Sequence, residues 1–228
     1  MKKIIVGTFR SGSTLLLDIE SNKDPSLINL GEYYLKSVRK ELGNIKQLTI
    51  SLFNNYSHFI HKMHGYSLYK GKGQMEDLQL NKYDEIVLLE RDDFWTQCCS
   101  WQVAAETEVW VQRKSFKENK YQNFTGQTCA VSFPTIFRMA VDKLMYNQIK
   151  EYVVKNDLKH IVVDYTKISS SKQAANSNII ENNYDYKTMI TNYNYGRIIT
   201  DVALDYIERN AVLTEKNNLK LEILNILK

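Results

Sequence analysis

The segment 3–17 constrains the fold of this chain more than any other stretch. Ile4 to Val6 is an apolar run of strand length, and a loop of glycines, hydroxyls and one arginine follows it. From Ser13 the sequence becomes apolar again, with leucines at helical spacing. A strand, a small-residue loop and a helix in this order bring free backbone N–H groups and the positive end of the helix dipole to the loop. The sequence therefore predicts a binding site for phosphate or a similar anion.

This loop differs from the phosphate loop of nucleoside triphosphatases, which reads G-x-x-x-x-G-K-[ST]. Gly7 and Gly12 have that separation, but Ser13 occupies the position of the lysine. The basic residue is instead Arg10, whose guanidinium is a forked and permanently charged donor. These differences disfavour a nucleoside triphosphatase. Three hydroxyls of the loop add further donors: Ser11, Ser13 and Thr14.

Length and composition indicate one α/β domain over residues 1–228. The net charge of +4 is mild and its charges are interspersed, so a dedicated nucleic-acid binder is not expected. No apolar run is long enough to span a membrane, and charge interrupts the N-terminal apolar stretch by Arg10, so we expect a cytosolic protein. The three cysteines, Cys98, Cys99 and Cys129, have the spacing of neither a disulfide framework nor a metal site. We expect them to be small apolar residues on a buried helix.

Apolar runs alternate with helical patterns along the chain, which is typical of an α/β fold with a largely parallel sheet. The expected strands are 4–6, 57–64, 83–91 and 161–165, and the expected helices include 13–19, 45–53, 93–111 and 135–154. We expect a turn at 21–25, a helix running through Glu41, a loop at 65–73 with three glycines, and a short helix at 75–80. Two polar segments, 112–133 and 170–196, are expected to be substrate or mobile loops.

A second informative segment begins where the strand at 83–91 ends. Arg91 lies at the carboxyl end of that strand, which is where ligands bind on parallel sheets. On the following helix Gln97 and Ser100 are three residues apart and share a face. Arg91 and Ser100 are thus placed to reach the oxygens of one phosphate.

Both segments resemble motifs of sulfotransferases that use 3′-phosphoadenosine-5′-phosphosulfate (PAPS). The run Arg10-Ser11-Gly12-Ser13-Thr14-Leu15 resembles the loop that binds the 5′-phosphosulfate, and Arg-x-Asp-x-x-x-Gln-x-x-Ser over 91–100 resembles the motif that binds the 3′-phosphate. The second motif is most similar to the bacterial sugar and glycolipid branch, which includes trehalose and nodulation-factor sulfotransferases. The resemblance covers about the first half of the chain, with a looser echo at 163–165.

The resemblance implies a P-loop-type parallel sheet and transfer of a sulfuryl group from PAPS to a hydroxyl, most plausibly of a carbohydrate or glycolipid. The product would be adenosine 3′,5′-bisphosphate (PAP), and no metal is required. Arg10 would stand near the bridging oxygen, residues 11–14 would hold the 5′-phosphate, and Arg91 with Ser100 would hold the 3′-phosphate.

Two residues are candidates for the base that accepts the proton of the acceptor hydroxyl. Glu32, in Gly31-Glu32-Tyr33-Tyr34, resembles the catalytic carboxylate of the bacterial branch. His64, in Lys62-Met63-His64, resembles the histidine of the K-x-H segment of cytosolic sulfotransferases. Glu32 is preferred because the 91–100 motif matches the bacterial branch, although a carboxylate needs a raised pKa or good alignment to act near neutrality. Lys62 is a candidate for neutralising the sulfuryl group.

Two other functions stay open at this point. One is a small-molecule kinase or another P-loop nucleotide-binding protein, which the missing lysine disfavours. The other is a non-catalytic module that binds a nucleotide or glycan. The sequence does not name the acceptor, and it leaves open whether the chain forms a homodimer.

Overall fold

The computed structural model describes residues 1–34, 44–70, 73–107, 110 and 131–169. Its centre is a five-stranded sheet in the order β2-β3-β1-β4-β5, and every neighbouring pair is parallel. The strands are β1 (Lys2–Gly7), β2 (Ile28–Asn29), β3 (Phe59–His64), β4 (Glu85–Glu90) and β5 (His160–Asp164). The predicted class, an α/β fold with a parallel sheet, is confirmed.

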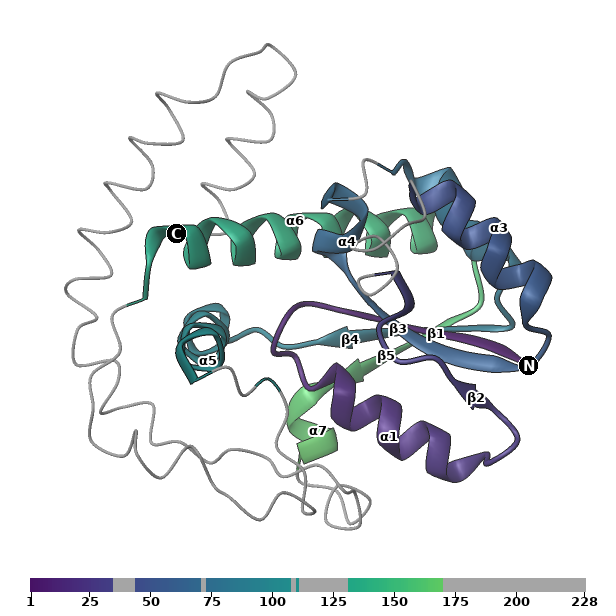
Figure 1. The fold of residues 1–228 in the computed structure, drawn as a ribbon, viewed down its shortest axis with the longest axis horizontal. Helices are drawn as coiled ribbons and strands as arrows, with labels where there is room; N and C mark the ends of the chain where they lie inside the picture. Colours follow the sequence, from purple (N-terminus) through teal and green to yellow (C-terminus); the bar gives the residue numbers. More distant parts are fainter. Residues whose placement is uncertain (35–43, 71–72, 108–109, 111–130, 170–228) are drawn as a thin grey trace.

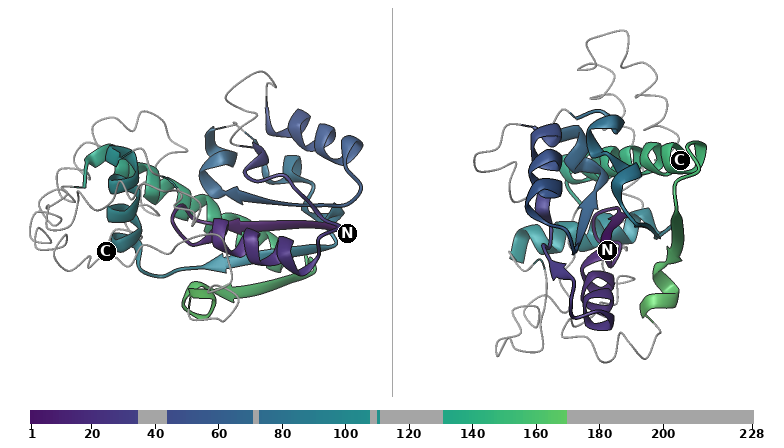
Figure 2. Two further views of the ribbon diagram at one scale, coloured as in Figure 1. Left: turned by 60° about the horizontal axis from the view of Figure 1, so that its bottom comes forward. Right: turned by 90° about the vertical axis from the view of Figure 1, so that its right-hand side faces the viewer.

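Helices cover both faces of the sheet (Figures 1 and 2). One face carries α1 and α7, the other carries α3, α4 and α6, and α5 lies beyond the carboxyl end of the strands. The helices are α1 (Ser13–Lys23), α3 (Ile45–Asn55), α4 (Gly65–Lys70), α5 (Phe94–Thr107), α6 (Phe133–Lys155) and α7 (Tyr165–Ser169). Two 3₁₀ turns, Met75–Leu78 and Leu80–Lys82, lie where a short helix was predicted.

The central strand is buried from Lys3 to Gly7 because helices pack on both of its faces. Ile4, Ile5 and Val6 are 0% exposed. Ile4 and Val6 belong to the core shared with α3 and α6, whereas Ile5 belongs to the core shared with α1 and α7. This two-sided burial explains why the strand is continuously apolar rather than alternating. An apolar stripe of α6 is likewise buried: Ile136, Ala140, Leu144, Ile149 and Val153.

The first helix is longer than predicted. We expected a turn from Ser21, but α1 continues to Lys23. The Ser21 hydroxyl donates to the Leu17 carbonyl one turn earlier, and the Lys23 ammonium pairs with Glu20 at 2.6 Å. Local side-chain contacts therefore carry the helix through residues that favour turns, and it ends just before Pro25.

The predicted loop at 65–73 was also wrong in its first part, which forms α4. Gly65 packs directly against α6: a Cβ at this position would lie 2.4 Å from the Asp142 carbonyl oxygen and 2.6 Å from the Tyr146 nitrogen. The N–H of Tyr66 donates to the Asp142 carboxylate at 2.6 Å, and Leu68 is buried in the core. Tertiary contacts thus override the glycine content of this segment.

Several predictions concern residues outside the described ranges. These are the helix through Glu41 beyond Tyr34, the segment 112–130 of the first polar loop, the whole second polar loop and Cys129. Within the described part, Cys98 and Cys99 are buried on α5 as expected. In the same part, none of the helices is both long and apolar enough to cross a membrane.

The close contact between α4 and α6 predicts a large cost for any side chain at Gly65. We expect Gly65→Ala to lower the free energy of unfolding by about 1–3 kcal/mol, because the new methyl group would overlap the α6 backbone. The midpoint of urea unfolding measures this loss. Ile50→Ala on the outer face of α3 is the control and should change little, since Ile50 is exposed. An unchanged midpoint for Gly65→Ala would contradict the packing described here.

Candidate functional site

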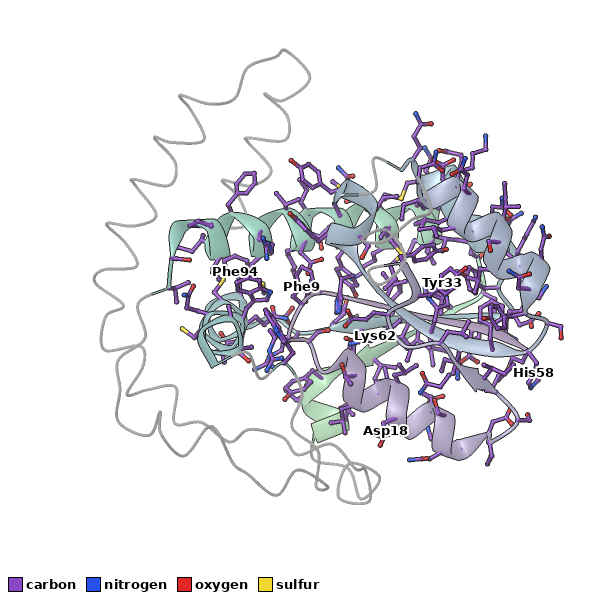
Figure 3. All side chains as sticks on the ribbon, viewed as in Figure 1. Phe9, Asp18, Tyr33, His58, Lys62 and Phe94 are labelled. Carbon is purple, nitrogen blue, oxygen red and sulfur yellow. The ribbon has the colours of Figure 1, made fainter. Side chains whose placement is uncertain are left out.

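The parallel register brings three strand ends into one row. Gly7 at the end of β1 lies opposite His64 at the end of β3 and opposite Leu89 near the end of β4. The segments that follow these strands therefore meet at the carboxyl edge of the sheet, the usual ligand-binding edge of this fold class. Figure 3, which labels Phe9, Lys62 and Phe94, shows the loop after β1, β3 and the start of α5 contributing side chains there.

The loop between β1 and α1 has an unusual backbone. Arg10 adopts a left-handed conformation with φ of 59°, and Gly12 follows with φ of 84°. For a residue with a Cβ this conformation costs about 1–2 kcal/mol. Gly12 is required for a second reason, because a Cβ there would lie 2.5 Å from the Tyr165 ring. The first turn of α1 has no side-chain cap, which leaves its backbone N–H groups pointing toward the loop.

Side chains from other elements hold the backbone before and after this turn. The Gln97 amide on α5 donates to the Phe9 carbonyl at 3.1 Å and to the Thr8 hydroxyl at 2.8 Å. The Arg91 guanidinium donates to the Arg10 carbonyl at 2.9 Å. The N–H of Phe9 donates to the Asp142 carboxylate on α6. The strained step at Arg10 is thus fixed by residues that are distant in the sequence.

The two predicted anion motifs lie together. The Arg10 Nε donates to the Ser100 hydroxyl at 2.8 Å, and its Nη1 donates to the Trp110 carbonyl at 2.6 Å. With the Arg91 bond to the Arg10 carbonyl, both ends of the second motif therefore contact the first. The Arg91 guanidinium therefore lies at the loop between β1 and α1. The two motifs must be this close if they are to bind one nucleotide.

Arg91 is oriented by an aromatic ring. The β4–β5 register pairs Glu90 with Asp164, so the next residues, Arg91 and Tyr165, emerge side by side. The Arg91 guanidinium carbon lies 4.2 Å from the centroid of the Tyr165 ring, a cation–π distance. The same ring covers Gly12, so Tyr165 contacts both anion motifs.

Glu32, Lys62 and His64 form a second cluster beside the loop. Lys62 and His64 are two residues apart on β3 and so project from the same face of the sheet. β2 continues its pairing with β3 as far as the bond from the Lys62 N–H to the Gly31 carbonyl, at 2.9 Å. Gly31 then turns in a left-handed conformation and brings Glu32 to the cluster. The Glu32 Oε1 lies 2.6 Å from the Lys62 ammonium and 3.3 Å from the His64 Nε2.

The charge of Glu32 is strongly stabilised. Burial alone would raise the pKa of its carboxyl, but the bonds and charges of His64 and Lys62 outweigh burial and hold the pKa well below its usual range. Both partners contact the same oxygen, Oε1. The other ring nitrogen of His64, Nδ1, faces the Gly7 carbonyl at 3.3 Å.

Lys62 connects this cluster to the anion loop. Its ammonium donates to the Thr14 hydroxyl at the start of α1, as well as pairing with Glu32. The loop has no lysine of its own at Ser13, so a lysine from β3 supplies an ammonium to the same helix start. The remaining predicted donors are buried here: Ser13 is 3% exposed, and the Ser11 hydroxyl has no hydrogen-bond partner in the described part of the chain.

Sequence reasoning missed two residues of the site. Tyr165 was noted only for the weak resemblance of 163–165 to a later strand of the sulfotransferase family. Its contacts with Arg91 and Gly12 follow only from the β4–β5 register. Asp142 was not considered, although a signal was present: on α6 it shares a face with Met145, Tyr146 and Ile149, so a carboxylate stands on a buried apolar face. A charge in that position requires partners, and here they are backbone N–H groups.

No metal centre is evident in the described ranges, where no group of three or more His, Cys, Asp or Glu side chains is arranged to hold an ion. Comparisons with protein-family models, with curated proteins and with solved structures found no match for this chain. Interpretation of the site therefore depends on its geometry and on the resemblance of its two motifs.

The lowered pKa of Glu32 predicts how its contribution to stability varies with pH. Because the pKa of this carboxyl is lower in the folded chain than the ordinary value of 4.5, the unfolded chain takes up protons first as the pH falls. We expect Glu32→Gln to cost about 1–3 kcal/mol at neutral pH. The difference from wild type should shrink as the pH falls below 4.5. Urea unfolding across this range measures it, and a difference independent of pH would contradict the ion-pair assignment.

Proposed function

We propose that the protein is a sulfotransferase that moves the sulfuryl group of PAPS to a hydroxyl, with a carbohydrate or glycolipid as the acceptor class. The observation that carries this proposal is the contact between the two motifs, Arg91 to the Arg10 carbonyl and Arg10 to Ser100. In sulfotransferases the corresponding motifs hold opposite ends of one nucleotide, which requires them to share a site.

The donors around the loop suit a dianionic phosphosulfate. The uncapped N–H groups of the first α1 turn and the helix dipole favour the 5′-phosphate. The Lys62 ammonium contacts Thr14 in the first turn of α1, and the Arg10 guanidinium, from the same loop, lies at Ser100. Arg91 and Ser100 are the candidates for the 3′-phosphate, and Ser100 would then exchange its bond to Arg10 for one to the ligand.

The proposed reaction is an in-line displacement at sulfur. The acceptor hydroxyl oxygen forms a bond to sulfur while the bond from sulfur to the bridging oxygen breaks, so PAP leaves with the electron pair of that bond. Arg10 neutralises the negative charge that grows on the departing phosphate, and Lys62 neutralises charge on the sulfuryl oxygens. By analogy with phosphoryl transfer, positioning and charge neutralisation supply most of the rate enhancement.

Glu32 is the better of the two candidate bases. Each ring nitrogen of His64 is already directed at a neighbouring oxygen, the Gly7 carbonyl or the Glu32 carboxylate, so neither is directed at an incoming hydroxyl. Glu32 is held as a carboxylate, and Lys62 and His64 both contact its Oε1. A carboxylate with a lowered pKa is a weak base, so alignment is its contribution: it takes the proton late, once the new bond to sulfur has made the hydroxyl acidic.

The two arginines provide the first test. We expect Arg10→Ala and Arg91→Ala each to weaken PAP binding by about 10–100-fold, because each removes a charge-assisted contact to a phosphate. Isothermal titration calorimetry with PAP measures the affinity. Lys150→Ala is the matched control: it removes a cation that pairs with Glu90, next to Arg91, on the side of α6. Wild-type affinity in both arginine variants would contradict the proposal, and binding of Mg-ATP in place of PAP would favour a kinase.

The role of Glu32 is tested by turnover. We expect Glu32→Gln to reduce kcat for sulfuryl transfer from PAPS to a sugar acceptor by about 100-fold or more while PAP affinity stays close to that of wild type. Release of PAP and appearance of a sulfated sugar measure the reaction. A wild-type rate in Glu32→Gln combined with loss of activity in His64→Gln would transfer the base role to His64. PAP binding without turnover in the wild type would favour a non-catalytic module.

A further inference from the structure

We propose that Asp142 is a positioning residue for the donor site, because it fixes the backbone of Phe9 immediately before the left-handed step at Arg10. This inference rests on the proposed function, since it assigns a role at the same anion-binding loop. Asp142 lies on α6, outside both sequence motifs, and it is 0% exposed.

One carboxylate holds two backbone segments. The Asp142 Oδ2 accepts the N–H of Phe9 in the loop after β1, and its Oδ1 accepts the N–H of Tyr66, the second residue of α4, at 2.6 Å. Bonds from N–H groups to an ionised carboxylate are stronger than those between neutral groups. Asp142 therefore joins the loop after β1 to the helix after β3.

The loop depends on this contact because its conformation is strained. Three consecutive peptide groups, from Thr8–Phe9 to Arg10–Ser11, are each held by one side chain. Asp142 accepts the Phe9 N–H, Gln97 donates to the Phe9 carbonyl, and Arg91 donates to the Arg10 carbonyl. Without Asp142 the part-buried Phe9 N–H loses its acceptor, a loss that favours rotation of the peptide. Relaxation of Arg10 toward a right-handed conformation would then redirect its guanidinium away from Ser100.

The next residue of α6 supports the same assignment. The Lys143 ammonium lies 3.5 Å from the Arg91 carbonyl. Asp142 and Lys143 thus contact the segments that carry the two anion motifs, one segment each. α6 therefore contacts both segments.

The charge on Asp142 is set by its surroundings. The titratable and charged groups that face it are His64 on β3 and Lys143 on α6, and the loop and α4 contribute the N–H groups of Phe9 and Tyr66. Burial raises the pKa of Asp142, and these four groups offset that rise only in part, so the resulting pKa is about 6. At neutral pH the group is a carboxylate and can accept both N–H bonds.

Two substitutions of Asp142 and one control test the proposal. Asp142→Ala removes both acceptor oxygens, Asp142→Asn keeps one, and Tyr146→Phe removes a buried α6 hydroxyl that has no hydrogen-bond partner in the described residues. At neutral pH we expect Asp142→Ala to weaken PAP binding by about 10–100-fold, Asp142→Asn to weaken it less, and Tyr146→Phe to leave it unchanged. A folded Asp142→Ala protein with a lowered unfolding midpoint but wild-type PAP affinity would overturn the positioning role.

A second measurement follows backbone amide resonances with pH in wild-type protein without a ligand. In wild-type protein, the backbone amide resonances of Phe9 and Tyr66 should titrate together with a midpoint near pH 6, because they share one carboxylate. The ring of His64 lies 4.5 Å from that of Phe9, so a titration of this histidine could also shift the Phe9 amide. The common titration should therefore persist in His64→Gln, which removes that histidine. Independent or absent titration would overturn the proposal. If the wild type fails to bind PAP, the proposed function fails, while this titration still decides the anchoring.

Discussion

The left-handed turn at Arg10 is the local constraint on which the rest of the site depends. An L-residue gains nothing from this conformation by itself, so the bonds around it must compensate. Three side chains from three elements supply them: Gln97 on α5, Arg91 after β4, and Asp142 on α6. The turn directs the Arg10 guanidinium across the loop to Ser100, and it leaves the start of α1 open to an anion.

The distribution of charge explains how a loop without the usual lysine can still serve an anion. Lys62 on β3 supplies an ammonium to the start of α1, where it contacts the Thr14 hydroxyl. Lys62 is 6% exposed, and Glu32 compensates its charge. One ammonium therefore contacts both the start of α1, at Thr14, and the candidate base, Glu32.

Much of the fold could be predicted from sequence because its signals are local. The strands β1 and β4 contain continuous apolar runs, and their parallel pairing brings Arg91 to the loop after β1. Other features depend on contacts that have no local signature. β2 has only two residues and no periodicity, so the approach of Glu32 to β3 could not be predicted from it. α4 contains Gly65, which suggests a loop until its packing on α6 is known, and Asp142 has a role only once the loop and α4 are placed on either side of it.

In the proposed function, two motifs about eighty residues apart, which contact each other at one sheet edge, hold opposite ends of one nucleotide. A crystal structure of the protein with PAP bound tests this claim most directly. We predict the 5′-phosphate at the first turn of α1, within reach of Arg10, and the 3′-phosphate against Arg91 and Ser100. A nucleotide bound elsewhere, or with its 3′-phosphate distant from Arg91, would contradict the account.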